Sequence, residues 1–308
     1  MNMLQRFLQR QTHRQNRKLD KQQEQGLVQQ WFLLAGKATQ GYPQPQQLNP
    51  IYPPNDRFWA DPFLWSKDGR YFIFFEDFPY ATWRGLISVL EVDEQGRQIS
   101  EAQAVIDEPY HLSYPFLFEH DGQLYMIPEK TQVKRIDLYR CIEFPYRWEF
   151  VHTLMDGIKA ADSTLIEHEG RWWLLCAAKM GRTRINESLF AFYADSPLST
   201  QWTPHPANPL VRDLSQGRPA GRIILSEQGH LLRPSQNCVK RYGCGININR
   251  IDNLTPHHYQ EETVWQVEAP NINSQWRAIH HLDYHQHLMV MDAQRLLPSE
   301  VVGNIKTL

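Results

Sequence analysis

The sequence lacks long apolar runs and has no excess of charge of one sign. Its purely apolar stretches are only a few residues long, as at 174–178, whereas a helix that spans a bilayer needs roughly 18. The 32 Lys and Arg residues against 34 Asp and Glu residues create no overall field that would attract nucleic acid. We therefore expect a soluble protein that recognises its partners locally and has no nucleic-acid partner.

Cysteine is scarce, and the familiar cofactor motifs are absent. The four cysteines include no C-x-x-C pair, which fits neither a disulfide framework nor a zinc site and predicts buried, reduced thiols. There is no P-loop, dinucleotide fingerprint, H-E-x-x-H motif or nucleophile elbow. The histidine-rich stretch 280–287 alternates as a strand does, so it is a weak metal candidate. We predict no cofactor and no metal.

The N-terminal residues do not form a secretory signal. Arg6, Gln9 and Arg10 interrupt the apolar residues there, so we expect a cytoplasmic location. Residues 1–25 are a basic, Gln-rich tail in which Leu4, Phe7 and Leu8 have helical spacing. One interpretation is that this tail binds peripherally to a membrane or contacts a glycosyltransferase partner. The alternative is a frayed tail, or a helix that lies on its own domain. Residues 26–56 are predicted to be an extended lead-in and propeller closure.

From Arg57 onward, one pattern repeats along the chain. Each copy has an apolar strand, a tight polar turn that usually holds a glycine, and a second apolar strand, as in a β-hairpin. The copies occupy 61–76, 114–129, 162–177, 221–236 and, in degenerate form, 278–293. Because a sizeable core is available from 42% hydrophobic residues, these hairpins can pack together as one domain.

The repeat length indicates the fold class. The turns lie about 50 residues apart, which leaves room for two more strands after each hairpin. Candidate strands are 86–92 with 102–106, 136–141 with 148–154, 189–193 with the segment at 202, and 245–251 with 263–267. We predict an all-β, five-bladed β-propeller over 57–308, preceded by a short helical or extended tail. A β-sandwich with similar hairpins is the alternative.

Carboxylates occur at equivalent positions of these repeats. The position eight residues before the turn holds Asp61, Tyr114 and Asp162 in the first three copies, and Glu129 follows its turn glycine by seven residues, as Glu76 does. In a propeller the first strand of each blade lines the central channel, so these residues should converge. Alternatively, each aspartate only caps its strand entry through bonds to backbone N–H groups.

Residues typical of a sugar site accompany the carboxylates. They are Trp59, His111, Ser113, Tyr114, Arg218, Arg222, Arg233, Gln236 and Tyr242. Acetal chemistry needs two carboxyl groups, one as acid and one as base or nucleophile, so we assign Asp61, Asp162 and Glu129 as catalytic candidates. The arginines either neutralise these carboxylates or bind an anionic glycan or sugar phosphate through the guanidinium fork. Because Asp61 and Asp162 can be satisfied by backbone N–H groups, we expect one arginine to stay free for such a ligand.

Seven motifs, in order, carry a family resemblance. They are 58–63 (FWADPF), 110–116 (YHLSYPF), 125–129 (YMIPE), 170–173 (GRWW), 202–209 (WTPHPANP), 218–222 (RPAGR) and 233–236 (RPSQ). Together they resemble the N-terminal propeller domain of the glucosamine inositolphosphorylceramide transferase family, over about residues 57–295. That domain is similar to five-bladed furanosidase and arabinanase propellers.

The resemblance implies roles for some of the carboxylates. In the furanosidase and arabinanase propellers an Asp that opens the first blade is the base, and an Asp in the third blade orients and tunes the acid; Asp61 and Asp162 match these positions. Those hydrolases take the acid Glu from the next blade, where this chain has Gly221 and Arg222. We therefore assign Glu129 as a substitute acid.

Two functions of different class follow. The first is a glycoside hydrolase-like or glycosyl-transferring propeller that acts on a glycosidic bond, with inversion at the anomeric carbon if it hydrolyses. The second is a non-catalytic glycan-binding or scaffold module of polysaccharide or glycolipid assembly. The plant members carry a separate transferase domain after the propeller, so we expect this propeller to act alone or with a partner protein.

Overall fold

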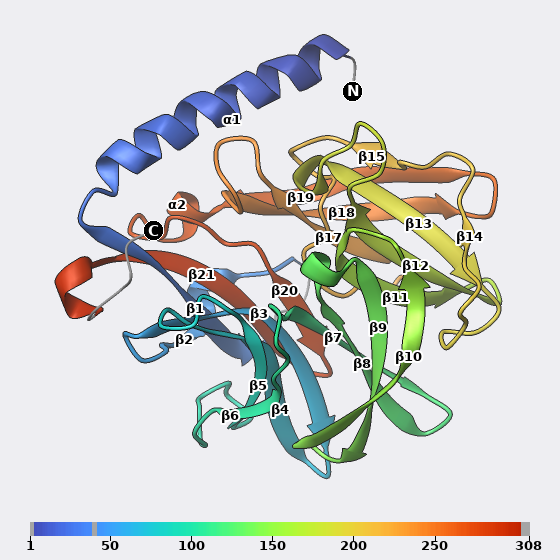
Figure 1. The fold of residues 1–308 in the computed structure, drawn as a ribbon, viewed down its shortest axis with the longest axis horizontal. Helices are drawn as coiled ribbons and strands as arrows, with labels where there is room; N and C mark the ends of the chain where they lie inside the picture. Colours follow the sequence, from blue (N-terminus) through green and yellow to red (C-terminus); the bar gives the residue numbers. More distant parts are fainter. Residues whose placement is uncertain (1–2, 39–41, 303–308) are drawn as a thin grey trace.

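The computed structural model describes residues 3–38 and 42–302, which form five antiparallel sheets arranged as the blades of a propeller (Figure 1). Blade 1 consists of β3 (Arg57–Lys67), β4 (Arg70–Pro79), β5 (Leu86–Val92) and β6 (Gln103–Ile106). Blade 2 consists of β7 (Ser113–His120), β8 (Gln123–Glu129), β9 (Arg135–Glu143) and β10 (Arg147–Asp156). The predicted fold class is confirmed.

The remaining blades use strands from both ends of the chain. Blade 3 contains β11 (Ala160–His168), β12 (Arg171–Ala178), β13 (Ser188–Ala194) and β14 (Thr203–Pro204), and β15 (Val211–Arg212) also pairs with β13. Blade 4 contains β16 (Ile224–Leu225), β17 (Leu231–Asn237), β18 (Gly245–Leu254) and β19 (Tyr259–Glu268). Blade 5 combines β20 (Leu282–His285) and β21 (Leu288–Pro298) with β1 (Leu27–Lys37) and β2 (Asn49–Ile51).

The ring closes between the two ends of the chain. β1 pairs with β21 along its whole length, from Leu27 opposite Pro298 to Lys37 opposite Leu288. The strand contributed by the N-terminal part of the chain is therefore the third strand of the fifth blade. Because backbone hydrogen bonds of a buried strand must be satisfied, this pairing completes the ring.

Hairpin turns join the first two strands of the blades as the repeat predicts. In blade 1, Lys67 pairs with Arg70 across Asp68 and Gly69, whose φ angles are 53° and 74°. Two consecutive residues with positive φ define a type I′ turn, which matches the right-handed twist of the flanking strands. Asp121–Gly122 and Glu169–Gly170 repeat this geometry.

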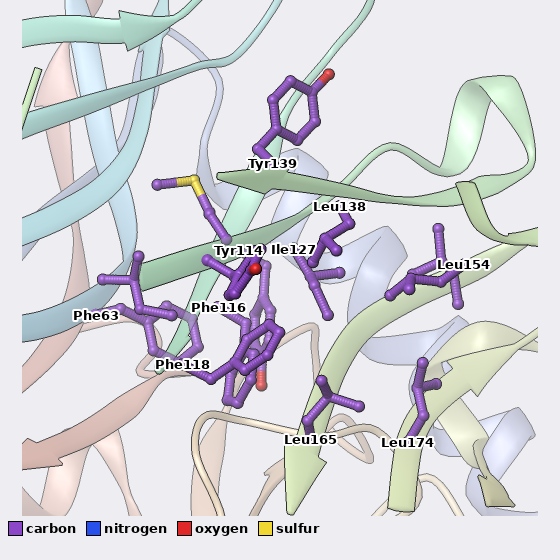
Figure 2. Close-up of a cluster of buried hydrophobic side chains, with 14 of the residues drawn as sticks. Phe63, Tyr114, Phe116, Phe118, Ile127, Leu138, Tyr139, Leu154, Leu165 and Leu174 are labelled. Atoms are coloured by element: carbon purple, nitrogen blue, oxygen red, sulfur yellow. The ribbon is translucent and has the colours of Figure 1, made fainter. Parts of the chain in front are cut away.

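The core lies between blades. A large cluster joins blades 1–3, and Figure 2 shows Phe63, Tyr114 and Phe116 gathered in it. The ring of Phe63 meets those of Tyr114 and Phe116 edge to face, with centroids 4.9 and 5.7 Å apart, a favourable aromatic arrangement. The four cysteines are buried and free, as predicted.

Helices are few in the part of the chain that the structure describes. α1 (Met3–Gln23) lies against the propeller, and α2 (Ala269–Ile272) follows β19; single 3₁₀ turns occupy Pro45–Gln47, Thr131–Val133, Ile185–Glu187 and Ser299–Val301. Among the described residues, no helix has the length and apolar character needed to cross a bilayer.

Candidate functional site

The inner strands carry a bulge at the position where the repeats place their carboxylates. Asp61, Tyr114 and Asp162 have φ angles of 51°, 45° and 55°, and the strand register shifts at each of them. A positive φ costs a non-glycine residue about 1–3 kcal/mol and is found most often at functional sites. The fourth blade has Gly221 there, with φ 135°. The bulge directs these side chains away from the normal alternation of the strand.

Asp162 is held by Arg218. The guanidinium Nε and Nη2 of Arg218 donate to the two oxygens of Asp162 at 2.5 and 3.2 Å, and Nη1 donates to Asn186 at 2.8 Å. The same guanidinium lies 3.8 Å from Glu129 and 5.0 Å from the ring centroid of Tyr242. Burial raises the pKa of Asp162 to about 6, although the charge of Arg218 opposes this shift.

Asp61 faces a histidine–carboxylate pair from blade 5. Its Oδ1 lies 3.8 Å from His280 Nε2 and 3.6 Å from His281 Nδ1, and its backbone N–H donates to Asp292. His280 forms an ion pair with Asp292 at 2.6 Å and stacks on Trp31 of β1 at 4.0 Å. Burial raises the pKa of Asp61 to about 7, while the charge on His280 lowers it.

Two glutamates adjoin these aspartates. Glu129 accepts a hydrogen bond from Thr131 and is paired with Ser113 in the ladder between β7 and β8. Glu76 is buried, and its Oε1 lies 3.4 Å from His111 Nε2. Burial, together with the charges of Asp61 and Glu129, raises the pKa of Glu76 well above its usual value.

Tyr114 links three blades across the channel. Its hydroxyl lies 2.9 Å from the Thr164 hydroxyl and accepts a hydrogen bond from the Gly221 N–H at 3.0 Å. Burial raises the pKa of Tyr114, and Asp162 and Asp61 raise it further. Asp162 is thus close enough to Asp61, Glu129 and Tyr114 to interact with each of them electrostatically.

All three predicted ligand arginines are already paired with carboxylates. Arg222 donates to Asp283 at 2.9 Å and to the Leu117 carbonyl at 2.6 Å. Arg233 donates through both arms of its fork to Glu261 at 2.8 and 2.7 Å. The expectation that one arginine stays free is therefore wrong. The acids Asp283 and Glu261 stand outside the two repeat positions that were compared, and each one pairs with an arginine.

Two other residues predicted to bind a sugar, Trp59 and Gln236, stabilise the fold instead. Trp59 is buried in the core and packs on Phe75 with ring centroids 4.9 Å apart, so it presents no face to a sugar. The backbone N–H of Gln236 donates to the Arg218 carbonyl at 2.9 Å, and its side chain faces Cys238. Gln236 thus positions the segment that carries Arg218.

Sequence reasoning gave no role to three residues that the fold brings to the site: Glu76, His280 and Asp292. Glu76 occupies the same repeat position as Glu129, so the repeat alone could have identified it as a candidate. Asp292 lies one residue away from the equivalent place in the fifth copy, so the alignment missed it. Asp61, His280 and Asp292 have potential ligand atoms within 4.8 Å of one another, and their mutual ion pairing accounts for this spacing without a metal.

The arrangement provides carboxyl groups in different protonation states. Asp61 and Asp162 have raised pKa values near neutrality, because burial outweighs their cationic neighbours. Asp292 stays ionised, since His280 lowers its pKa despite burial. Carboxyl groups whose environments separate their pKa values are the usual basis of acid–base chemistry in a single site. These features define a five-bladed β-propeller with a buried carboxylate site at its inner strands.

Comparison with known proteins places the chain in a family. Residues 49–304 match the sequence profile described as "Glucosamine inositolphosphorylceramide transferase 1, N-terminal", and the chain belongs to this family, as its motifs predict. It is 36% identical over 258 residues to glucosamine inositolphosphorylceramide transferase 1 of Oryza sativa subsp. japonica, covering 80% of this chain and 34% of that protein. The protein of the same name from Arabidopsis thaliana is 33% identical over 236 residues, covering 74% and 30%.

The chain thus spans about a third of the length of these relatives. Among solved structures it is similar to the catalytic domain of a Coprinopsis cinerea GH62 α-L-arabinofuranosidase, with TM-score 0.57 and 11% identity, covering 77% of this chain and 90% of that one. An α-L-arabinofuranosidase from Lactobacillus brevis gives TM-score 0.54 and 15% identity, covering 76% and 81%. At these identities the likeness supports the fold alone.

Proposed function

We propose that this propeller acts on a glycosidic bond, with Asp61 as general base, Glu129 as acid and Asp162 as the group that positions the acid. The observation that carries the proposal is the shared guanidinium of Arg218, which binds Asp162 and reaches Glu129 at 3.8 Å. A general base works best when its pKa lies near the working pH, and burial brings the pKa of Asp61 to about 7. Two proteins of similar fold are α-L-arabinofuranosidases, which is consistent with this chemistry.

A panel of glycans tests the activity. We expect the protein to release a sugar from one member of a panel that includes furanosides and amino sugars, and we expect D61N and E129Q to lower the rate at least about a hundredfold, the usual range for general acid–base groups. The control D68N changes an exposed turn aspartate and should keep full activity. Equal rates in D61N and the unmodified protein would rule out the assigned base.

The stereochemical outcome is a separate prediction. If the protein hydrolyses its substrate, we expect inversion: Glu129 would protonate the leaving group while Asp61 activates a water on the other face of the sugar, which requires roughly 6.5–9.5 Å between the two carboxyl groups. Proton NMR of the first-formed anomer measures this directly. A retained anomer would contradict the mechanism but leave the glycosidic activity standing.

The alternative is a glycan-binding module without turnover, alone or beside a glycosyltransferase partner. It is favoured by the burial of the carboxylates, since Asp61 is only 5% exposed and Asp162 only 1%. Its ligand would be a glycan or sugar phosphate, as the relatives' name suggests. Because the three arginines are engaged, an anionic group would bind at the cavity of about 510 Å³ that Arg17, Lys21 and Tyr242 line. Calorimetry that detects binding to a glycan which is never cleaved would support this alternative.

A further inference from the structure

Helix α1 packs on the propeller with its polar face. Gln9 donates to Asp213 at 2.9 Å, and Arg10 forms an ion pair with Glu187. Further along, Asp20 accepts hydrogen bonds from Arg241 at 2.8 and 3.1 Å. A helix on the surface of a globular protein normally turns its apolar face inward. In α1 this orientation is reversed, since polar and charged groups make the contacts with the propeller.

The apolar side chains of α1 at Leu4, Phe7, Leu8 and Leu19 are consequently exposed to solvent. Leu4, Phe7 and Leu8 are 66%, 55% and 51% exposed, and Leu19 is 54% exposed. The first three have i, i+3 and i+4 spacing and so form one continuous patch on the helix. A clustered apolar patch on a soluble surface is typical of an interaction site.

The same helix carries a strong positive charge. Its cations are Arg6, Arg10, Arg14, Arg17, Lys18 and Lys21, against the single acidic residue Asp20. Arg10 and Asp20 are engaged by the propeller, whereas Arg14, Arg17, Lys18 and Lys21 are exposed. Exposed apolar side chains beside a surplus of Arg and Lys are the composition of helices that lie in the interface of an anionic membrane.

We propose that the outward face of α1 docks on an anionic phospholipid surface. Leu4, Phe7 and Leu8 would lie at the boundary between headgroups and acyl chains, and Arg14 and Lys18 would contact the headgroups. The charge of the helix favours this occupant over a neutral apolar protein surface. A second copy of this chain would bring two such helices together and oppose their like charges.

A cavity between α1 and the propeller lies next to the carboxylate site. Arg17, Lys21 and Asp20 of α1 line the cavity of about 510 Å³ whose other side includes Tyr242 and Asn186. Both of these residues contact Arg218, so the cavity adjoins the carboxylate site. The docking itself does not depend on the proposed glycosidic chemistry.

Vesicle co-sedimentation of the full-length chain tests the proposal. The probes are vesicles of phosphatidylcholine alone and of phosphatidylcholine with about one third phosphatidylserine. We expect binding to the anionic vesicles only. F7E/L8E should lower the partition coefficient at least about tenfold because two apolar side chains no longer enter the bilayer. R14Q/K18Q should lower it about tenfold by removing two headgroup contacts.

Matched controls separate docking from general surface effects. I99E/L225E introduces the same two charges at side chains that are 59% and 65% exposed elsewhere, and R97Q/R147Q removes two exposed arginines from blades 1 and 2. Both controls should bind like the unmodified chain. The proposal is overturned if the chain does not bind anionic vesicles or if F7E/L8E binds as well as I99E/L225E. It is also overturned if light scattering shows a dimer that only F7E/L8E dissociates.

Discussion

At the scale of single residues, the site is a group of buried acids with few cations to balance them. Asp162 and Glu129 share the guanidinium of Arg218, Asp61 faces the pair of His280 with Asp292, and Glu76 lies beside His111. A buried carboxylate without a partner either takes up a proton or destabilises the fold. The raised pKa values of Asp61, Asp162 and Glu76 follow from this shortage of positive charge.

Removing Arg218 should therefore destabilise the protein strongly. We expect R218Q to lower the free energy of unfolding by about 3 kcal/mol, because it leaves the Asp162 carboxylate buried and unpaired. Urea unfolding of R218Q, D162N and R218Q/D162N measures the coupling, and the double variant should recover part of the loss. The control R147Q breaks an exposed pair with Glu143 and should cost less than about 1 kcal/mol. A loss in R218Q no larger than in R147Q would contradict this view of the site.

The raised pKa of Asp61 predicts the pH dependence of stability. Because the folded protein holds this proton more tightly than the unfolded chain, the stabilisation is complete below about pH 4 and is lost as the pH rises to about 7. Asp162, with its pKa near 6, acts in the same direction. The melting temperature of D61N relative to the unmodified protein should therefore increase between pH 4 and pH 8, as measured by scanning calorimetry. In D68N, whose aspartate is exposed, the difference should stay constant; a flat D61N profile would refute the assignment.

At the scale of the elements, the bulge in the inner strands places the side chains of the candidate site at equivalent positions of successive blades. Three blades place a side chain at this bulge, and the fourth has Gly221. A Cβ at Gly221 would lie 1.8 Å from the Leu282 carbonyl oxygen, so the backbone of β20 passes where a side chain would otherwise be. The fourth blade contributes Arg218 from the preceding segment instead.

This close approach distinguishes Gly221 from Gly170, although both have positive φ angles, 135° and 70°. We expect G170A, in an open hairpin turn with no atom within 4 Å, to cost about 1 kcal/mol from its positive φ alone. G221A adds a clash with backbone and should cost more than about 3 kcal/mol or prevent folding. Thermal unfolding of the two variants measures the difference. Similar losses would show that the packing of Gly221 against Leu282 is not rigid.

At the scale of the whole molecule, the propeller depends on a strand from the N-terminal part of the chain. β1 supplies Trp31, Phe32 and Leu34 to the core and pairs with β21 along its length. It also places Trp31 against His280 of the candidate site. Ring closure and site assembly are consequently coupled, whereas α1 contacts the outside of the ring through polar pairs.

Two truncations test this division. Removing residues 1–23 should leave the fold intact and lower the melting temperature by only a few degrees, because Glu187 keeps its ion pair with Arg212 and no described apolar residue of α1 belongs to the buried core. Removing residues 1–37 takes away β1, exposes the edge of β21 and should abolish cooperative unfolding. Circular dichroism during heating distinguishes the two. A cooperative transition in the shorter chain would show that blade 5 tolerates two strands.

The sequence by itself determined the repeat and therefore the architecture. Hairpin turns such as Asp68–Gly69 are local features, because the positive φ that they need is encoded in the turn residues themselves. Strand alternation and spacing are local too, so the five blades and the equivalent positions of Asp61 and Asp162 on their inner strands could be predicted. The cytoplasmic location and the catalytic roles remain predictions.

Only the tertiary structure decided which charged groups face one another. Arg218, Arg222 and Arg233 look equivalent in sequence, yet they bind Asp162, Asp283 and Glu261, which lie 56, 61 and 28 residues away along the chain. Pairing between distant residues depends on how the strands of different blades are brought together, and no local pattern records it. For the same reason, the sequence does not reveal the contact of Trp31 with His280 or the reversed orientation of α1. Each of them depends on contacts between residues that are far apart in the chain.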